Sequence, residues 1–387
     1  MRVRDYHRRV TSLSPSGPVR LNGITGLRWW AAFAVFCHHF LNLAPLPPIV
    51  SGYAKFGSLG VTFFFVLSGF VLTWSWTETT DRATFYWRRF ARIYPLHLLT
   101  FLLAIPVFYR LVPDPSETWI KPLDIGILLL SVVLLQGWWR EETILFSGNP
   151  AAWTLTVEAF FYALHPFAIA PLRRLRLRGA LIAAGVVVVL MFGLRGVIVA
   201  APAAGVGGWP WPILHLSAFG LGMCVAWAYR QGWRLRVSPW VWGAALFAWF
   251  TALLALRRPE GQWLYGIAGA YVTEVVTVLC ALLIASVATR DLEGRGGWLG
   301  SRPIVALGEW SFAFYLIHAT IIYPMRELFG FQEGSLLRSA FWFALVLGAS
   351  ILASWLLHAG VERPVERRLR RWQQARRSRA AVPASVV

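Results

Sequence analysis

Long apolar runs separated by short polar linkers dominate the pattern of this chain. Eleven runs approach the length of a membrane-spanning helix. They cover residues 25–45, 56–76, 94–112, 122–139, 152–171, 179–200, 211–229, 239–256, 264–288, 304–324 and 338–361. A helix needs about 20 residues to cross the hydrocarbon core of a bilayer, and several runs barely reach that length. The pattern predicts an all-α fold, a polytopic bundle of transmembrane helices.

The amino-acid composition supports this fold class. Of the 387 residues, 57% are hydrophobic and only 14% are charged, whereas a soluble globular chain carries about 25% charged residues. These values exclude an intrinsically disordered chain, a coiled coil and a secreted module held by disulfides. Cys37, Cys224 and Cys280 all lie in apolar runs without metal-ligand spacing. We therefore expect buried structural thiols and no metal site.

The longest polar stretches are the two ends of the chain. Residues 1–22 are basic and lack an apolar centre, so we expect a cytoplasmic tail and no cleaved signal peptide. Glu362 and Pro364, in the sequence VERP, are expected to end the last span. Residues 365–387 then form a basic, disordered tail on the cytoplasmic leaflet. The short linkers leave residues 23–364 as one membrane-embedded domain.

The net charge of +19 comes from 37 basic and 18 acidic residues, and only Lys55 and Lys121 are lysines. In a soluble protein this charge would suggest a nucleic acid partner. Here the arginines flank apolar runs, which favours anionic lipid headgroups and the positive-inside rule instead. The basic clusters are Arg2–Arg20, Arg82–Arg92, Arg173–Arg178, Arg230–Arg236, Arg290–Arg302 and Arg363–Arg379.

These clusters constrain the number of crossings. If all of them face the cytoplasm, an even number of spans must separate each pair. Only the interval between Arg92 and Arg173 breaks this rule, because it contains three apolar runs. One of the runs 94–112, 122–139 and 152–171 should therefore be re-entrant, broken or interfacial. We predict about ten full spans in the plasma membrane, both termini in the cytoplasm, and a site near the irregular run, where irregular backbone can line a cavity.

The first apolar run carries ionisable residues, which a membrane span accommodates only at a cost. On a helix, Arg28 and His39 are about 20° apart in projection and about 16 Å apart along the axis, whereas His38 projects about 80° from Arg28. An arginine that holds phosphate and a histidine base at depth on the same face suit a long, phosphorylated acyl donor. The alternative is that the histidines only pack beside Trp29 and Trp30.

Two further polar pairs have helical spacing. Arg89 and Arg92 lie three apart, so their guanidiniums project from one helix face and form either a phosphate clamp or an ordinary basic flank. Glu158 lies within an apolar run, with Tyr162 one turn further on. A lone carboxylate there must pair or take up a proton. Its candidate roles are to orient a histidine, to accept a proton or to bind an arginine.

The remaining candidates are uncharged or weakly basic. Ser311, Tyr315 and His318, at spacings of four and three, form a polar stripe that either belongs to a substrate site or only holds the bundle together. Ser68 lies beside Gly69 and outside any G-x-S-x-G elbow, so helix packing is favoured over a serine nucleophile. The sequence contains no Walker A, H-E-x-x-H, paired C-x-x-C or Rossmann glycine motif.

In this order the segments resemble the acyltransferase 3 family of integral membrane acyltransferases. The matching pieces are the Arg-x10-His spacing of Arg28 and His39, then GVTFFFVLSGF, RRFARIYP with Arg89 and Arg92, WTLTVEAFFY with Glu158, LGEWSFAFYLIH and VERP. Each piece is weak alone, but their order is specific and extends over nearly the whole chain.

The resemblance implies transfer of an acyl group, usually from acyl-CoA, to a hydroxyl. Carried over by position, His39 corresponds to the essential histidine, and Glu158 belongs to the site. The donor would be held by Arg28, Arg89 and Arg92. Acyl-CoA, in the simplest case acetyl-CoA, is then a substrate, and no permanently bound cofactor is needed.

The acceptor is less narrowly implied. Family members act on cell-envelope polysaccharides, peptidoglycan, lipid-linked sugars and macrolide antibiotics, and some carry an extra extracytoplasmic domain that this chain lacks. The compact form and the Trp-Trp after Arg28 resemble the actinobacterial type, which favours a macrolide or related natural product over an envelope carbohydrate. The alternative from another class is a transporter or flippase that uses Glu158 and the arginines as a polar path. The absence of evident repeats argues against it.

Overall fold

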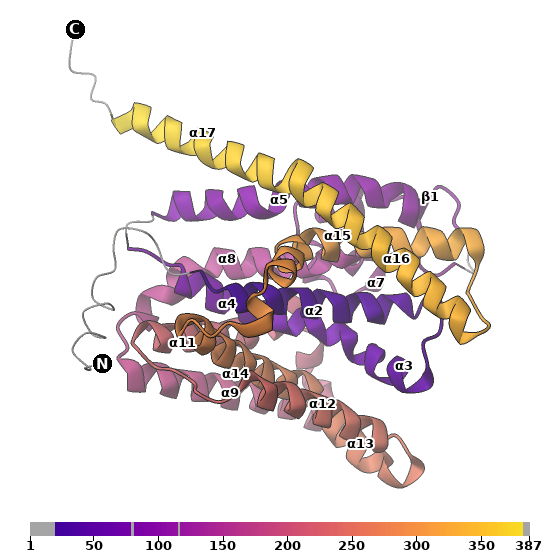
Figure 1. The fold of residues 1–387 in the computed structure, drawn as a ribbon, viewed down its shortest axis with the longest axis horizontal. Helices are drawn as coiled ribbons and strands as arrows, with labels where there is room; N and C mark the ends of the chain where they lie inside the picture. The colour runs from indigo at the N-terminus through magenta and orange to yellow at the C-terminus, as the bar shows by residue number, and fades with distance from the viewer. Residues whose placement is uncertain (1–19, 79–80, 115–116, 382–387) are drawn as a thin grey trace.

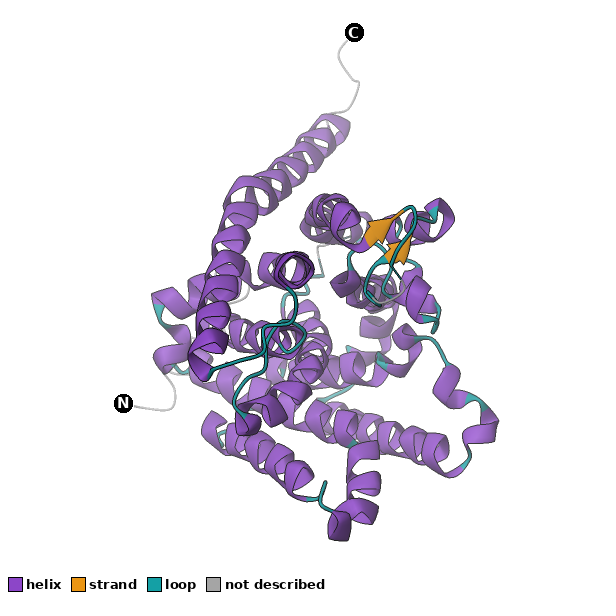
Figure 2. Ribbon diagram, turned by 90° about the vertical axis from the view of Figure 1, so that its right-hand side faces the viewer, coloured by secondary structure: helices purple, strands orange, loops and turns teal. Residues whose placement is uncertain are grey.

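The structure is a computed structural model that describes residues 20–78, 81–114 and 117–381. Its helices form a bundle and run mostly along one direction (Figure 1). The sheet in the described residues has two short strands, β1 (Tyr109–Arg110) and β2 (Lys121–Pro122), paired in parallel at the edge of the bundle (Figure 2). The predicted all-α bundle is therefore confirmed.

Ten long helices correspond to ten of the apolar runs. They are α2 (Asn22–Phe40), α4 (Gly60–Trp74), α5 (Arg82–Phe108), α8 (Trp153–Leu172), α9 (Leu177–Ala200), α11 (Leu216–Arg230), α12 (Pro239–Ala255), α14 (Val272–Leu292), α15 (Arg302–Phe329) and α16 (Leu336–Leu357). Shorter helices lie between them: α3 (Pro48–Ala54), α6 (Ile125–Val132), α7 (Glu142–Leu145), α10 (Trp211–Leu214) and α13 (Gln262–Ala270). The last helix is α17 (Arg363–Ala381).

The irregular run that the charge pattern requires is 122–139. There the chain forms only the eight-residue α6, followed by a 3-10 turn at Gln136–Trp138. At a length of about 12 Å, α6 is too short to cross a bilayer. Among the described residues, eight helical segments are long and apolar enough to cross, and the α12–α13 pair, bent by 112°, makes a ninth. The 19-residue α2 falls outside that count but lies in the middle of the bundle (Figure 1).

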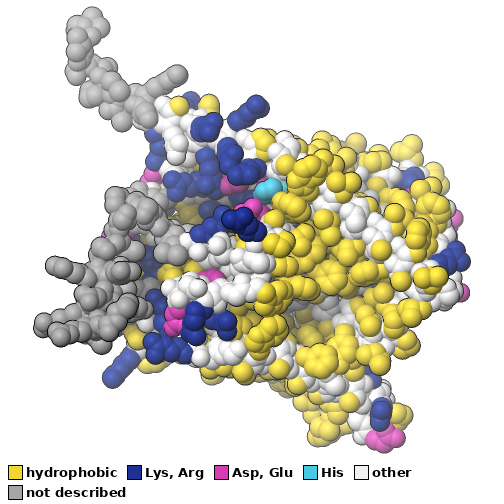
Figure 3. Space-filling view, viewed as in Figure 1, with side chains coloured by type: hydrophobic (Ala, Val, Ile, Leu, Met, Phe, Trp, Pro, Cys, Tyr) yellow, Lys and Arg dark blue, Asp and Glu magenta, His cyan; other side chains and the backbone are white. Residues whose placement is uncertain are grey.

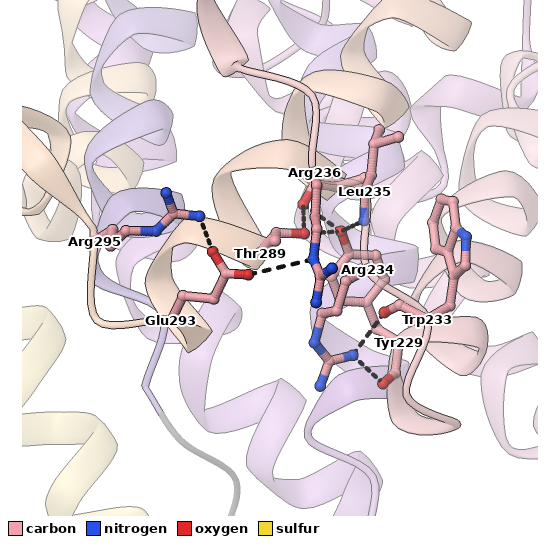
Figure 4. Close-up of polar contacts among 9 residues, drawn as sticks. Tyr229, Trp233, Arg234, Leu235, Arg236, Thr289, Glu293 and Arg295 are labelled. Atoms are coloured by element: carbon pink, nitrogen blue, oxygen red, sulfur yellow. Dashed lines mark hydrogen bonds and ion pairs between the residues drawn. The ribbon is translucent and has the colours of Figure 1, made fainter. Parts of the chain in front are cut away.

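The arginines gather at one end of the bundle, on the left of Figure 3, where α5 begins and α17 ends (Figure 1). Contacts join clusters that are far apart in the sequence. Arg173 lies 2.7 Å from Glu78, which precedes α5. Arg236 lies 3.8 Å from Glu293, which also pairs with Arg295 (Figure 4). These clusters therefore share one end of the bundle, as the even-number rule required.

Figure 4 shows how the α11–α12 turn is fixed to α14 at this end. The hydroxyl of Tyr229 lies 2.6 Å from Thr289 Oγ1 and accepts a hydrogen bond from the backbone N–H of Leu235 at 3.1 Å. Arg234 folds back and donates to the carbonyl oxygens of Tyr229 at 2.7 Å and Trp233 at 2.6 Å. A basic turn next to a membrane is thus held by satisfied backbone groups.

The expectation of a disordered tail is wrong for its described part. A π-helical turn at His358–Glu362 joins α16 to α17, so the VERP sequence does not end the helix. Pro364 follows the π-helical turn as the second residue of α17. Trp87 of α5 donates to the carbonyl of Leu369 at 2.9 Å and so ties α17 to α5. Residues 1–19 and 382–387 of the two tails lie outside the described residues.

Glycine sets the distance between α4 and α11. A Cβ on Gly69 would lie 2.0 Å from the carbonyl oxygen of Phe219, and one on Gly222 would lie 2.0 Å from that of Val66. Real Cβ atoms do not approach backbone that closely, so any side chain at these positions must push the helices apart. The predicted close approach at Gly69 is confirmed.

We therefore expect Gly69→Ala to lower the free energy of unfolding by at least about 1–3 kcal/mol, the usual cost of overpacking a well-packed contact. Thermal unfolding of the purified protein in detergent measures the change. Gly185→Ala in α9 is the matched control, because a Cβ there meets nothing within 4 Å. Equal thermal stability of the two variants would contradict the close crossing.

Candidate active site

A central cavity of about 180 Å³ lies where α2, α4, α5, α8 and α15 meet. Its polar lining residues are Arg28, Ser68, Arg89, Arg92, Thr154, Glu158, Tyr162, Ser311 and Tyr315. Every predicted site residue except the three histidines is in this set. The first half of α8 lines the cavity, and α7 separates α8 from the irregular run 122–139. No residue of that run is among the lining residues, so the expectation that irregular backbone lines the site is wrong.

Arg28 and Arg89 reach the cavity without a direct ion pair to a carboxylate of the described residues. Arg28 makes no hydrogen bond or ion pair among the described residues, and the Nε of Arg89 is buried without a hydrogen-bond partner. The guanidinium of Arg89 lies over the rings of Phe85 and Tyr162, 5.9 and 5.8 Å from their centroids. Arginine stays charged in proteins, so two such groups in a half-buried cavity favour an anionic ligand.

Arg92 differs from its neighbour Arg89 because it has a carboxylate partner. It pairs with Glu362, whose side chain is 1% exposed, and lies 3.5 Å from Glu366. Glu362 in turn lies 3.0 Å from the Nδ1 of His358, one turn earlier. The predicted clamp of two equivalent arginines is therefore asymmetric, with Arg89 open and Arg92 already engaged.

Glu158 is the one carboxylate among the residues that line the central cavity. The hydroxyl of Tyr162 donates a hydrogen bond to its Oε1. Thr154, Glu158 and Tyr162 follow each other at spacings of four, so α8 presents one polar stripe to the cavity. Thr154 extends this stripe across the cavity, because its hydroxyl donates to that of Tyr315 at 3.1 Å.

His39 and His318 form a pair beside the cavity, and neither is among its lining residues. The Nδ1 of His318 lies 2.7 Å from the carbonyl oxygen of Tyr315, and the Nδ1 of His39 lies 3.0 Å from that of Val35. A carbonyl oxygen only accepts hydrogen bonds, so both Nδ1 atoms of the neutral rings carry the proton. The Nε2 of His318 is then an acceptor, and it lies 3.2 Å from the Nδ1 of His39.

This tautomer assignment leaves the Nε2 of His39 unprotonated and able to act as a base. The contact between the Nε2 of His318 and the Nδ1 of His39 fixes the orientation of the His39 ring, as a third group does for a histidine base. His38 takes no part in this chain of contacts. Its ring meets His39 edge-on at 5.2 Å, and its Nδ1 is buried without a partner.

The rest of the polar stripe on α15 points to the cavity. Ser311 is buried and donates to the carbonyl of Gly308 at 2.8 Å. Tyr315 links the two halves of the site, since its hydroxyl meets Thr154 and its carbonyl binds His318. Ser68, on α4, also lines the cavity, and its buried Oγ has no hydrogen-bond partner among the described residues.

Comparison with known proteins decides the family. Residues 21–359 match the model of the acyltransferase domain family that the motifs resemble. The chain belongs to this family. It is 36% identical over 385 residues to the acyltransferase MdmB of Streptomyces mycarofaciens, which covers 92% of this chain and 94% of MdmB.

A second relative is longer. The O-acetyltransferase OatA of Staphylococcus aureus is 26% identical over 343 residues, which cover 83% of this chain and 53% of OatA. This chain therefore spans about half the length of OatA. No solved structure matches the chain.

Two residues of the site, Glu362 and Thr154, were not predicted from the sequence. Glu362 was interpreted only as the end of a span, although a carboxylate next to a membrane run needs a partner as much as Glu158 does. Its spacing of four from His358 was the available signal. Thr154 gave no signal, because a hydroxyl in an apolar helix usually bonds to its own backbone.

Removing the charge of Glu362 tests the asymmetry between the two arginines. We expect Glu362→Gln to cost about 3 kcal/mol of stability, at the low end for a broken buried ion pair, because Arg92 keeps some contact with water. Thermal unfolding in detergent measures it. Glu327→Gln removes an exposed ion pair with Arg110 of 2.7 Å and should cost only about 0–1 kcal/mol. Similar losses in both variants would contradict the assignment.

Proposed function

We propose that this acyltransferase moves an acyl group from acyl-CoA, in the simplest case acetyl-CoA, to a hydroxyl of a macrolide antibiotic or related natural product. The observation that carries the proposal is the open Nε2 of His39, whose ring is held by His318, next to a cavity in which Arg28 and Arg89 make no direct ion pair with a carboxylate of the described residues. A base and an anion site together suit transfer from a phosphorylated donor.

The donor would lie along α2. Arg28 is eleven residues from His39, which is about 16 Å on a helix, so a donor held by phosphate at Arg28 needs a long arm to bring its carbonyl to the histidine. Arg89 lines the same cavity and adds a second guanidinium for the phosphates. Arg92, held by Glu362, keeps α5 in place and adds positive potential without being free to bind a ligand.

In the proposed reaction the Nε2 of His39 takes the proton of the acceptor hydroxyl as that oxygen attacks the thioester carbonyl. The tetrahedral intermediate collapses, the C–S bond breaks, and the thiolate of CoA takes the proton from the imidazolium. His318 accepts the Nδ1–H of His39 throughout and so stabilises the transient charge. A covalent acyl-histidine route would use the same Nε2 as the nucleophile.

Glu158 has a positioning role in this scheme. Its hydrogen bond comes from Tyr162, and it faces the arginines of the cavity rather than His39. One candidate role of Glu158 was to orient a histidine. In this scheme His318 has that role and Glu158 does not. Glu158 then balances part of the guanidinium charge and holds the phenol of Tyr162 at the cavity wall.

The macrolide acceptor is supported by the end-to-end similarity to an acyltransferase of Streptomyces. The alternative acceptor is a cell-envelope polysaccharide, peptidoglycan or lipid-linked sugar, which the similarity to OatA supports over a smaller share of that protein. We also propose that the arginine-rich end of the bundle faces the cytoplasm of the plasma membrane, by the positive-inside rule. Both termini would then be cytoplasmic, on the side where acyl-CoA is available.

His39 and His318 should respond differently to substitution. We expect His39→Ala to lose about 10²–10⁴-fold in kcat, the usual contribution of a general base. His318→Gln keeps an acceptor near Nδ1 of His39 and should lose less than His318→Ala. Turnover of labelled acetyl-CoA in isolated membranes, with His38→Ala as the control, measures these effects. Full turnover of His39→Ala with loss only in His38→Ala would overturn the assignment.

The acceptor is tested by mass spectrometry of extracts from cells with and without the protein. We expect macrolide-class products whose mass differs by one acyl group, and their loss in cells that carry His39→Ala. An acyl group found instead on envelope glycans would replace the macrolide by the alternative acceptor.

A further inference from the structure

A second cavity, of about 170 Å³, lies between α5 and α17 at the basic end of the bundle. We name it the α5–α17 cavity. Its lining residues are Thr84, Arg88, Arg370, Gln373, Gln374 and Arg377. Each of them carries a hydrogen-bond donor, three are guanidiniums, and none is a carboxylate. This set of donors matches the oxygens of a phosphate group.

Nearby carboxylates compensate only part of this positive charge. Arg377 donates to Asp81 at 2.6 Å, and this hydrogen bond holds the pKa of Asp81 well below its ordinary value. Arg370 pairs with Glu366, but its Nε is buried without a hydrogen-bond partner. Arg88 makes no hydrogen bond or ion pair within the described residues. A bound anion would give Arg88 a partner and would give the Nε of Arg370 the acceptor that it lacks.

The α5–α17 cavity and the central cavity lie beside the same stretch of α5. Arg88 lines the α5–α17 cavity, and Arg89, the next residue of α5, lines the central cavity. Glu366 of α17 lies 3.5 Å from Arg92 on the central cavity and also pairs with Arg370 on the α5–α17 cavity. A single extended ligand can therefore contact both cavities along the same stretch of α5.

We propose that the α5–α17 cavity binds the phosphate on the ribose of the acyl donor, while the diphosphate lies at Arg28 and Arg89 and the thioester lies deeper in the central cavity. This inference rests on the proposed function. The same phosphate chemistry is offered by the headgroup of an anionic lipid, since the cavity lies at the end of the bundle where lipid headgroups gather. The adjacent arginines of α5, and the ion pairs of Glu366 with Arg92 and Arg370, favour the donor. On this view α17 is a wall of the donor site and not a passive tail.

A pair of donors tests the proposal, because acetyl-pantetheine carries the thioester of acetyl-CoA but none of its nucleotide phosphates. We expect Arg88→Gln and Arg370→Gln each to raise the KM for acetyl-CoA about tenfold relative to the KM for acetyl-pantetheine, the loss that one charged hydrogen bond predicts. Arg370→Lys should recover part of the loss. Arg371→Gln is the matched control, because Arg371 is exposed on α17 and does not line the cavity.

Equal increases in KM for both donors would overturn the proposal, since the arginines would then support the fold and not the nucleotide. A second measurement does not depend on turnover. Labelled adenosine 3′,5′-bisphosphate, the nucleotide end of the donor, should bind the wild-type protein in phosphatidylcholine nanodiscs and bind Arg370→Gln more weakly.

These measurements separate the two proposals. Wild-type protein that binds the bisphosphate but never acylates would refute the proposed function and leave the phosphate cavity supported. Turnover with unchanged KM and unchanged bisphosphate binding in both variants would refute the cavity and leave the function standing. Loss of co-purifying phosphatidylglycerol in Arg370→Gln, with an unchanged KM for acetyl-CoA, would assign the phosphate to a lipid and overturn the donor assignment.

Discussion

The positive charge of three arginines inside the bundle is the constraint that shapes the site. A guanidinium cannot lose its proton in a protein, so Arg28, Arg89 and Arg92 must each be paired, hydrated or bound to a ligand. The central cavity offers them a single lining carboxylate, Glu158, and a second, Glu362, reaches Arg92 from the end of α16. The helices α2, α5, α8 and α16 are thereby drawn toward one point, with positive charge left over for a ligand.

This constraint also explains how much of the molecule could be predicted. The placement of arginines along the chain predicts that the basic clusters lie at the same end of the bundle and that one run between Arg92 and Arg173 is irregular. Both predictions follow from counting the spans between arginines. The same rule could not say which of the three runs between Arg92 and Arg173 fails to cross. That depended on the turn after α6, where Leu134 adopts a positive φ and the helix stops.

The sequence predicts which site residues share a face of one helix, but it does not predict the contacts between residues of different helices. Arg28 with His39, Glu158 with Tyr162, and Ser311 with Tyr315 are pairs on one helix, which fixed spacing reveals. The contacts between helices, such as Arg92 with Glu362 and His39 with His318, depend on packing that no local pattern encodes. The same limit applies to α17, which is tied to α5 by the hydrogen bond from Trp87 to the carbonyl of Leu369.

The use of a second histidine behind the base follows from the surroundings of α15. A carboxylate behind His39 would need its own compensation in a region where Phe36 and Phe314 are fully buried. A neutral imidazole orients the base without adding a charge, and its remaining proton is satisfied by the carbonyl of Tyr315. Charge is thereby confined to the arginine end of α2, about three turns from the base. In the proposed reaction, this arrangement puts positive charge at the phosphates of the donor and an uncharged base at its carbonyl.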